Sequence, residues 1–388
     1  MKNKCISEYL LKLSWLSFLP LIIVGSIFYE ERLGMGGISL NTILFVISLC
    51  SLSLSVYLSN GTIKTLDFSI ISLFFFIAFA PLFFYTSDAS IDGVLKYSDS
   101  LAIGVLGAVI LSCALTNNDI ESYFNNLILF MLVLFISAIV WKLAFGFWRR
   151  EIPYFMNGSI VFGRNMAVGF FAVLLFPPKN IIIKKILFFI FSFGVLWSMS
   201  KGPIISFLIC FSFYLYFESK FKFIFSIFII TVLFYLILFN YIDFSGTALY
   251  RLQVGLQVVT GVSDSLQAAG SVNIRADMFH LTYNAIKNNL FTGVGAGRWS
   301  EYFYSDFTYP HNIFLEVFFD LGLIYGLVFL FPYVSFIVHF KNYFYIFPLF
   351  FFISHQMSGD VADARWLLLF SMLVILNKSM RVGQLKIE

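Results

Sequence analysis

The stretch Tyr309-Pro-His-Asn-Ile-Phe-Leu-Glu316 closes a long polar segment, residues 242–310, and opens an apolar run that extends to residue 338. It places a histidine, an asparagine and a glutamate where water gives way to hydrocarbon. Ionisable groups at the edge of a membrane are costly, so a function is the first expectation for them. The stretch therefore predicts a membrane-spanning helix and a functional site at its start.

The composition of the whole chain also predicts a membrane protein. Of the 388 residues, 60% are hydrophobic and 12% are charged, whereas soluble domains contain about 25% charged residues. The four cysteines lack the spacing of a metal site or a disulfide framework. No small-residue cleavage site follows the first apolar run, so we expect this run to span the membrane. The predicted fold class is an all-α, polytopic membrane protein.

Twelve apolar runs are candidates for spanning helices, although eleven or thirteen spans also fit the pattern. A span needs about 20 residues, and several runs reach that length only with flanking polar residues included. The runs fall at residues 13–29, 38–58, 69–85, 101–115, 124–141, 166–176, 186–199, 204–217, 223–241, 313–338, 343–354 and 365–376.

The runs and the polar segment divide the chain into three expected parts. Residues 1–241 hold transmembrane helices 1–9, residues 242–310 form a large loop on the outer side of the membrane, and residues 311–388 hold helices 10–12 and a cytoplasmic tail. With both termini in the cytoplasm, 13 of the 25 basic residues and 6 of the 21 acidic residues fall inside. That sorting follows the positive-inside rule. The cations left outside are mostly arginines, with Lys96, Lys142, Lys201 and Lys287.

The large loop is expected to carry a helix over residues 274–289. Asn273 is its predicted N-cap, and Arg275 lies in its first turn, where free amides and the helix dipole favour an anion. The sequence Gly293-Val-Gly-Ala-Gly297 is expected to end the helix. It is no dinucleotide fingerprint, because no strand surrounds it.

His311 is the candidate general base, because histidine can accept a proton near neutral pH. On a continuous helix, Gly322 lies eleven positions on and about 20° from the direction of His311. A small residue there lets another helix approach closely. The other interpretation is a histidine that simply reaches water at the membrane surface.

The outer cations Arg164, Lys201, Arg275 and Arg365 are candidates for a basic pocket that binds a lipid-borne phosphate. In the other interpretation, Arg365 pairs with Asp360 or Asp363 and braces the last outer loop. The sequence holds no Asp-x-Asp pair and no His/Cys cluster, which disfavours a metal-assisted mechanism.

These motifs together resemble the O-antigen ligase and O-antigen polymerase family. The shared pattern is a Ser-Arg/Lys-Gly turn between spans, an arginine opening a loop helix, a Gly-x-Gly turn, and His-Asn followed by a glycine. Here these motifs are Ser200-Lys-Gly202, Arg275, Gly293-Val-Gly295 and His311-Asn312 with Gly322. The family's ligases commonly have arginine where this chain has Lys201, and lysine binds a phosphate only as a point charge.

The resemblance implies an inverting, metal-independent glycosyl transfer at the periplasmic face of the bacterial inner membrane, without a cofactor. The donor is a glycan on undecaprenyl pyrophosphate, and the acceptor is a sugar hydroxyl. The implied catalytic residues are His311 and Arg275, and the implied pyrophosphate-binding residues are Arg275, Lys201, Arg164 and Arg365. The implied supporting residues are Asn312, Glu316, Asp360 and Gly322, with either acid a candidate to orient His311.

The sequence of residues 309–316 and the phenylalanine-rich composition, with 52 phenylalanines, resemble those of the polymerases more than those of the ligases. Polymerases join lipid-linked repeat units. A ligase, which transfers the glycan to lipid A–core, is the alternative, and a transporter of lipid-linked oligosaccharide is a second one. The expected partners are membrane lipids and the lipid-linked glycan, with a chain-length regulator and a flippase as further candidates. No nucleic-acid partner is expected.

Overall fold

The computed structural model describes residues 2–25, 27, 34–35, 38–59, 89–116, 119–149, 152–154, 158–238, 266–305, 307–339 and 342–376. Helices make up nearly all the regular structure of these residues. The exception is a two-residue antiparallel pair of strands, β1 (Gly34–Met35) and β2 (Ile38–Ser39). The all-α class predicted from composition is therefore confirmed.

The chain divides into two compact units, one formed by Met1–Phe130 with Thr282–Glu388, the other by Met131–Leu281. The division falls inside α5 (Ile120–Phe145) and inside α11 (Leu266–Asn288). The other helices of the first unit are α1 (Lys2–Val24), α2 (Leu40–Leu58), α4 (Ile91–Thr116), α12 (Trp299–Phe303), α13 (Ile313–Val334), η1 (Ser335–His339), η2 (Tyr343–Tyr345), α14 (Ile346–Ser358) and α15 (Arg365–Leu376). The second unit holds α6 (Ser159–Leu175), α7 (Ile181–Trp197), α8 (Lys201–Glu218) and α9 (Lys220–Leu238).

The helices follow the apolar runs of the sequence. Every predicted run contains a helix except residues 69–85, which lie outside the described residues. Five helical segments of the described chain are long and apolar enough to cross a membrane: Cys5–Val24, Leu40–Leu58, Ile91–Leu115, Ile120–Phe145 and Ile313–His339. The polytopic class is thus confirmed, whereas the count of twelve spans and the three-part division along the membrane stay predictions.

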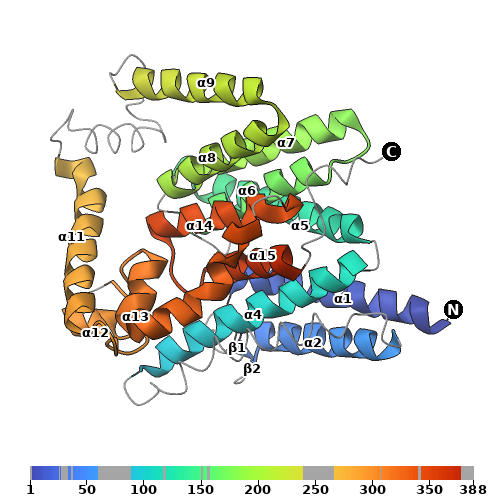
Figure 1. Cartoon of the computed structure of the whole chain (residues 1–388). Helices are drawn as coiled ribbons and strands as arrows, with labels where there is room; N and C mark the ends of the chain where they lie inside the picture. Colours follow the sequence, from blue (N-terminus) through green and yellow to red (C-terminus); the bar gives the residue numbers. More distant parts are fainter. Residues whose placement is uncertain are drawn as a thin grey trace. The chain divides into compact units, whose positions relative to one another are not determined.

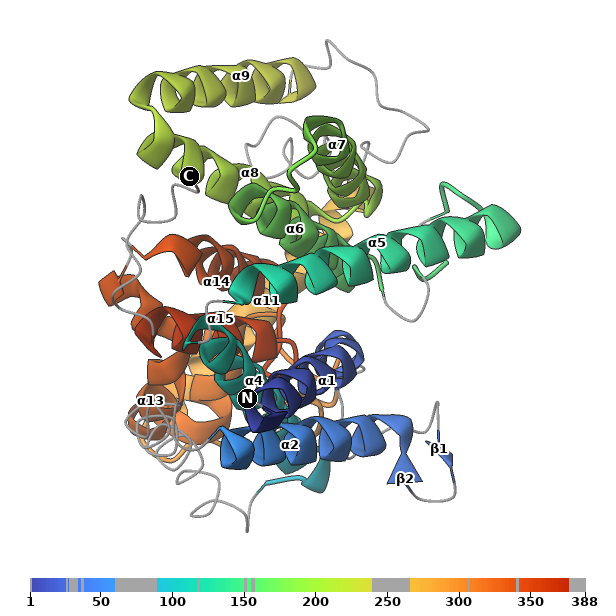
Figure 2. The same cartoon turned by 90° about the vertical axis from the view of Figure 1, so that its right-hand side faces the viewer.

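Serine side chains join α1 to α2 within the first unit, where the two helices lie side by side (Figures 1 and 2). The hydroxyl groups of Ser7 and Ser55 donate to each other's backbone carbonyls at 2.8 and 2.7 Å, and Ser14 and Ser48 do the same at 2.7 and 2.9 Å. Such small polar residues let helices approach closely in an apolar medium and bond across the contact. The two pairs therefore define the register of α1 against α2.

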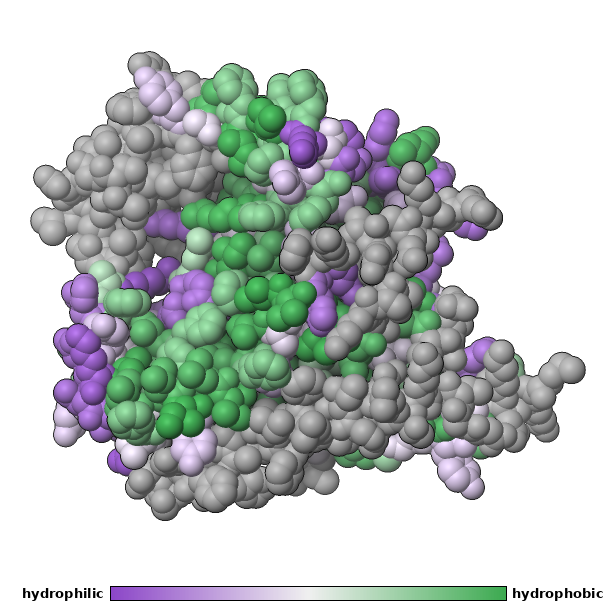
Figure 3. Space-filling view, in the orientation of Figure 1, coloured by the Kyte–Doolittle hydropathy of each residue, from purple (hydrophilic) through white to green (hydrophobic). Residues whose placement is uncertain are grey.

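The helix surfaces that remain exposed are apolar. On α13 the side chains of Ile324, Leu327 and Phe331 are more than half exposed, as are Phe221 and Phe228 on α9. Figure 3 shows the hydrophobic colouring over α13, in contrast to the hydrophilic stretch along α11. Large exposed apolar faces mark a surface that contacts lipid or another protein, as expected for spanning helices.

Candidate functional site

The glycine-rich segment after α11 docks onto a break in α13. The amides of Val294 and Gly295 donate to the carbonyls of Phe319 and Asp320 at 2.8 and 3.0 Å, and the Leu323 amide donates to the Leu290 carbonyl at 2.7 Å. Gly322, in the middle of α13, has φ +73° and ψ 178°, which is not helical. Backbone carbonyls and amides at this break have no partner within the helix. The segment after α11 supplies their hydrogen-bond partners.

The predicted role of Gly322 as a contact between helices is wrong. A Cβ atom at Gly322 would lie 2.6 Å from the carbonyl oxygen of Phe291, so the segment after α11 makes the close approach. The expected alignment of His311 with Gly322 is also wrong, because His311 lies before α13 and the helix is broken at Gly322. The expectation that the glycine-rich segment ends a helix is confirmed, since α11 ends at Asn288.

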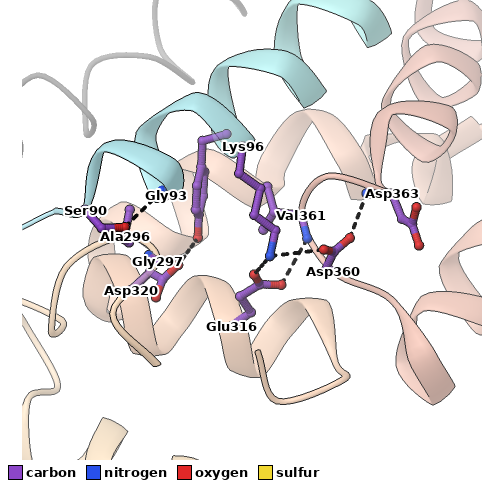
Figure 4. A network of polar contacts seen from close by, with 11 residues as sticks. Ser90, Gly93, Lys96, Ala296, Gly297, Glu316, Asp320, Asp360, Val361 and Asp363 are labelled. Atoms are coloured by element: carbon purple, nitrogen blue, oxygen red, sulfur yellow. Dashed lines mark hydrogen bonds and ion pairs between the residues drawn. The ribbon is translucent and has the colours of Figure 1, made fainter. Parts of the chain in front are cut away.

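The same glycine-rich segment contacts the start of α4. The Ser90 amide donates to the Ala296 carbonyl at 2.9 Å, and a Cβ at Gly93 would lie 2.3 Å from that oxygen. The carboxylate of Asp320 accepts hydrogen bonds from the Gly297 amide at 3.3 Å and from the Tyr97 hydroxyl at 2.9 Å. Residues 293–297 therefore lie between α4 and α13, as Figure 4 shows for Ala296 and Gly297.

One turn further along α4, Lys96 joins three separate parts of the chain (Figure 4). Its ammonium nitrogen lies 2.5 Å from Oε1 of Glu316 on α13 and 3.1 Å from Oδ2 of Asp360 in the loop before α15. The second oxygen of each acid binds that loop, because Oε2 of Glu316 accepts from the Val361 amide and Oδ1 of Asp360 from the Asp363 amide. Glu316 is only 3% exposed, and charges this buried need such complete pairing.

Tyr309 connects this ion cluster to His311. The Lys96 nitrogen lies 4.8 Å from the centre of the Tyr309 ring, within the range of a cation–π interaction. The Tyr309 ring also packs edge-on against His311, with 4.5 Å between ring centres. Burial, together with the charges of Asp360 and Asp363, raises the pKa of the Tyr309 hydroxyl well above its usual value, so this ring stays neutral.

The surroundings of Asp360 favour the ionised form of its carboxyl group. Burial alone would raise this pKa, but the charge of Lys96, the Asp363 amide and the charge of Arg365 together lower it below its usual value. All four carboxylate oxygens of Glu316 and Asp360 are bound by Lys96 and by the last loop. The orientation of His311 by either acid stays a prediction.

His311 lies just before α13, in a left-handed conformation with φ +57°. The helix begins at Ile313, because Asn312 is its N-cap and accepts from the Phe314 and Leu315 amides at 3.0 and 3.1 Å. The amide group of Asn312 also donates to the carbonyl and side-chain oxygens of Gln356. The helix thus starts two residues after His311, and Asn312 ties the start of α13 to α14.

Arg365 is 3% exposed and binds backbone carbonyls. Its guanidinium group donates to Ile22 at 2.7 Å, Ile23 at 3.1 Å and Ala362 at 2.6 Å, and lies 3.7 Å from the carboxylate of Asp363. The first two carbonyls belong to the last turn of α1, which carries negative charge and lacks partners within the helix. Arg365 thus braces the end of α1 and the loop before α15. This agrees with the interpretation in which Arg365 pairs with an aspartate and braces the last outer loop.

The other predicted phosphate-binding residues lie in the second unit. Lys201 begins α8 after a turn in which Met199 has φ +55°, in agreement with the expected tight turn. Arg164 is buried in the second turn of α6, which begins at Ser159. Because Arg275, Lys201 and Arg164 belong to one unit and Arg365 to the other, their common pocket stays a prediction.

Arg275 does not lie at a helix start. The helix α11 begins at Leu266, and Arg275 falls in its interior, so the predicted Asn273 cap is wrong. Amides in a helix interior bond the carbonyls four residues earlier. The helix dipole and free amides therefore add nothing to anion binding at Arg275, and any affinity comes from its guanidinium group.

The sequence did not single out Lys96 or Tyr97 as site residues. Lys96 was only one of the expected outer cations. A usable signal existed, because Glu316 and Asp320 are acids inside an apolar run and such groups need partners. Among the described residues no group of three or more His, Cys, Asp or Glu side chains could hold a metal ion.

The helical fold and its long apolar helices define the class of an α-helical, polytopic membrane protein. Residues 186–331, less than half of the chain, match the family model described as O-antigen ligase. The match confirms the resemblance to the O-antigen ligase and polymerase family over this stretch, and it supports a membrane glycosyltransferase activity of the ligase or polymerase type. No curated protein matches the chain.

Proposed function

We propose that the protein is a surface-polysaccharide polymerase that joins undecaprenyl-pyrophosphate-linked repeat units at the periplasmic face of the bacterial inner membrane. The observation that carries the proposal is the family match over residues 186–331, which includes Lys201, Arg275, His311 and Gly322. The transfer is inverting and independent of metal. The products are a lengthened lipid-linked glycan and free undecaprenyl pyrophosphate.

In the proposed reaction His311 takes the proton of the acceptor hydroxyl. The hydroxyl oxygen then forms the new bond to the anomeric carbon of the donor, while the bond from that carbon to the pyrophosphate oxygen breaks. The leaving pyrophosphate carries the released electron pair, and Arg275 and Lys201 stabilise its charge, with Arg164 as a further candidate. The left-handed backbone at His311 supports this role, because strained residues cluster at functional sites.

The arrangement of helix ends in the first unit supports a site on one side of the membrane. The end of α1 meets the start of α15 through Arg365, and the starts of α4 and α13 meet near the same loop through Lys96. With a cytoplasmic N-terminus, alternation along the chain brings all four of these ends to the outer side. The ion pair between Lys12 and Asp119 joins two residues expected inside.

A ligase that transfers the glycan to lipid A–core is the second candidate, because the matching family model is described as O-antigen ligase. The polymerase comes first because the stretch 309–316 and the phenylalanine-rich composition are more similar to polymerases. A deletion strain analysed on a lipopolysaccharide gel separates the two functions. Core carrying one repeat unit supports a polymerase, whereas bare core with accumulated lipid-linked polymer supports a ligase.

The site assignment is tested by His311→Ala and Arg275→Ala. Both variants are expected to abolish surface polysaccharide while the amount of protein in the membrane stays unchanged, because one removes the base and the other the leaving-group cation. A wild-type polysaccharide profile in either variant would contradict its assignment. Flipping of a lipid-linked oligosaccharide without chain growth would instead support a transporter.

A further inference from the structure

The Lys96 cluster connects parts of the chain that are far apart in the sequence. Lys96 comes from α4, Glu316 from α13 and Asp360 from the loop before α15 (Figure 4). A buried ion cluster contributes little net stability compared with apolar residues of the same size. Its effect on the molecule is to fix three elements in one geometry, which is useful where a nearby group must be held accurately.

The group held near this cluster is His311. The Lys96 ammonium group lies over one face of the Tyr309 ring, and His311 packs edge-on against that ring. Pro310, which joins Tyr309 to His311 in the sequence, is buried and has a restricted backbone. Asn312, on the other side, is fixed by its bonds to α13 and to Gln356. His311 keeps its left-handed conformation, which persists only where the surroundings over-determine it.

We propose that Lys96 is a positioning residue for the His311 base, because its ammonium group clamps the Tyr309 ring, against which the His311 imidazole packs. The inference rests on the proposed function, in which His311 takes the acceptor proton. Lys96 acts through Tyr309 and does not touch the acceptor. A misplacement of a reacting group by about 1 Å can lower the rate about 100-fold, so loss of the clamp affects turnover more than donor binding.

The test uses full-length protein in proteoliposomes with the undecaprenyl-pyrophosphate-linked repeat unit extracted from the deletion strain. Lys96→Met removes the charge, and Lys96→Arg keeps it. The double variant Lys96→Met with Glu316→Gln also removes the more buried acid, so that it folds without an unpaired carboxylate at Glu316. Lys12→Met is the matched control, because Lys12 pairs with Asp119 in the same unit but is 43% exposed.

In Lys96→Met and in the double variant, kcat is expected to fall about 100-fold with the KM for the lipid-linked donor unchanged. Lys96→Arg is expected to recover most of the loss, and Lys12→Met to behave as wild type. Wild-type kcat in the double variant would overturn the clamp. So would an Arg variant as slow as the Met variant, or a loss that only follows the amount of folded protein.

His311→Ala in the same assay separates failure of the clamp from failure of the proposed function. If His311→Ala keeps wild-type turnover, His311 is not the base and the proposed mechanism fails whatever Lys96 does. If His311→Ala is inactive while the double variant turns over normally, the mechanism stands and the clamp alone is wrong.

Discussion

At the scale of single residues, the buried Arg365 stabilises the fold by binding backbone carbonyls. Three of its hydrogen bonds end on backbone carbonyls, two of them in the last turn of α1. Hydrogen bonds from a charged group contribute about 1.5–3 kcal/mol each. Arg365→Met is therefore expected to lower the free energy of unfolding by about 3 kcal/mol or more, measured by thermal unfolding in detergent.

Arg298→Met provides the comparison for this prediction. Arg298 pairs with Glu301 at 3.3 Å, but both side chains are more than 40% exposed, and exposed pairs contribute about 0–1 kcal/mol. An unchanged melting temperature in Arg365→Met, together with a raised KM for the lipid-linked donor, would contradict the bracing role and favour the predicted pyrophosphate contact.

At the scale of elements, the contact between the glycine-rich segment and α13 depends on Gly322. An alanine there would have φ +73° and a Cβ 2.6 Å from the Phe291 carbonyl, and backbone strain of this kind costs about 1–3 kcal/mol. Gly322→Ala is expected to destabilise the protein by at least that amount and to abolish surface polysaccharide. Thermal unfolding and the polysaccharide profile measure the two effects.

Gly158→Ala is the matched control, since a Cβ at Gly158, the N-cap of α6, meets nothing within 4 Å. Its cost is expected to be below about 1 kcal/mol. If Gly322→Ala is as stable as Gly158→Ala, the segment after α11 does not pack against α13 as described.

The elements that sequence patterns predict well are those set by long apolar runs. The run 313–338 corresponds to α13 and η1, because burial of backbone polar groups in an apolar medium leaves the helix as the available structure. The start of α11 was missed because Gly270 and Ser271 favour turns locally, and the helix nevertheless includes them. The pairing of Lys96 with Glu316 spans 220 positions, and no local pattern encodes a contact between such distant residues.

At the scale of the whole molecule, the contact between Ser90 and Ala296 makes a prediction about sidedness that does not depend on the number of spans. Because Ser90 bonds the segment that leads into α12, Asp92 and Glu301 are expected on the same side of the membrane. In a cysteine-free variant, Asp92→Cys and Glu301→Cys should both react with a membrane-impermeant maleimide applied from the periplasmic side.

Lys179→Cys and Lys220→Cys complete the experiment, because the positive-inside rule assigns both lysines to the cytoplasm. They are expected to react only after the membrane is permeabilised, and all four positions are suitable because their side chains are exposed. Labelling of Asp92→Cys and Glu301→Cys from opposite sides would contradict the packing of the first unit. Labelling of all four from outside would instead leave that packing intact and contradict the alternation of spans, on which the periplasmic location of His311 depends.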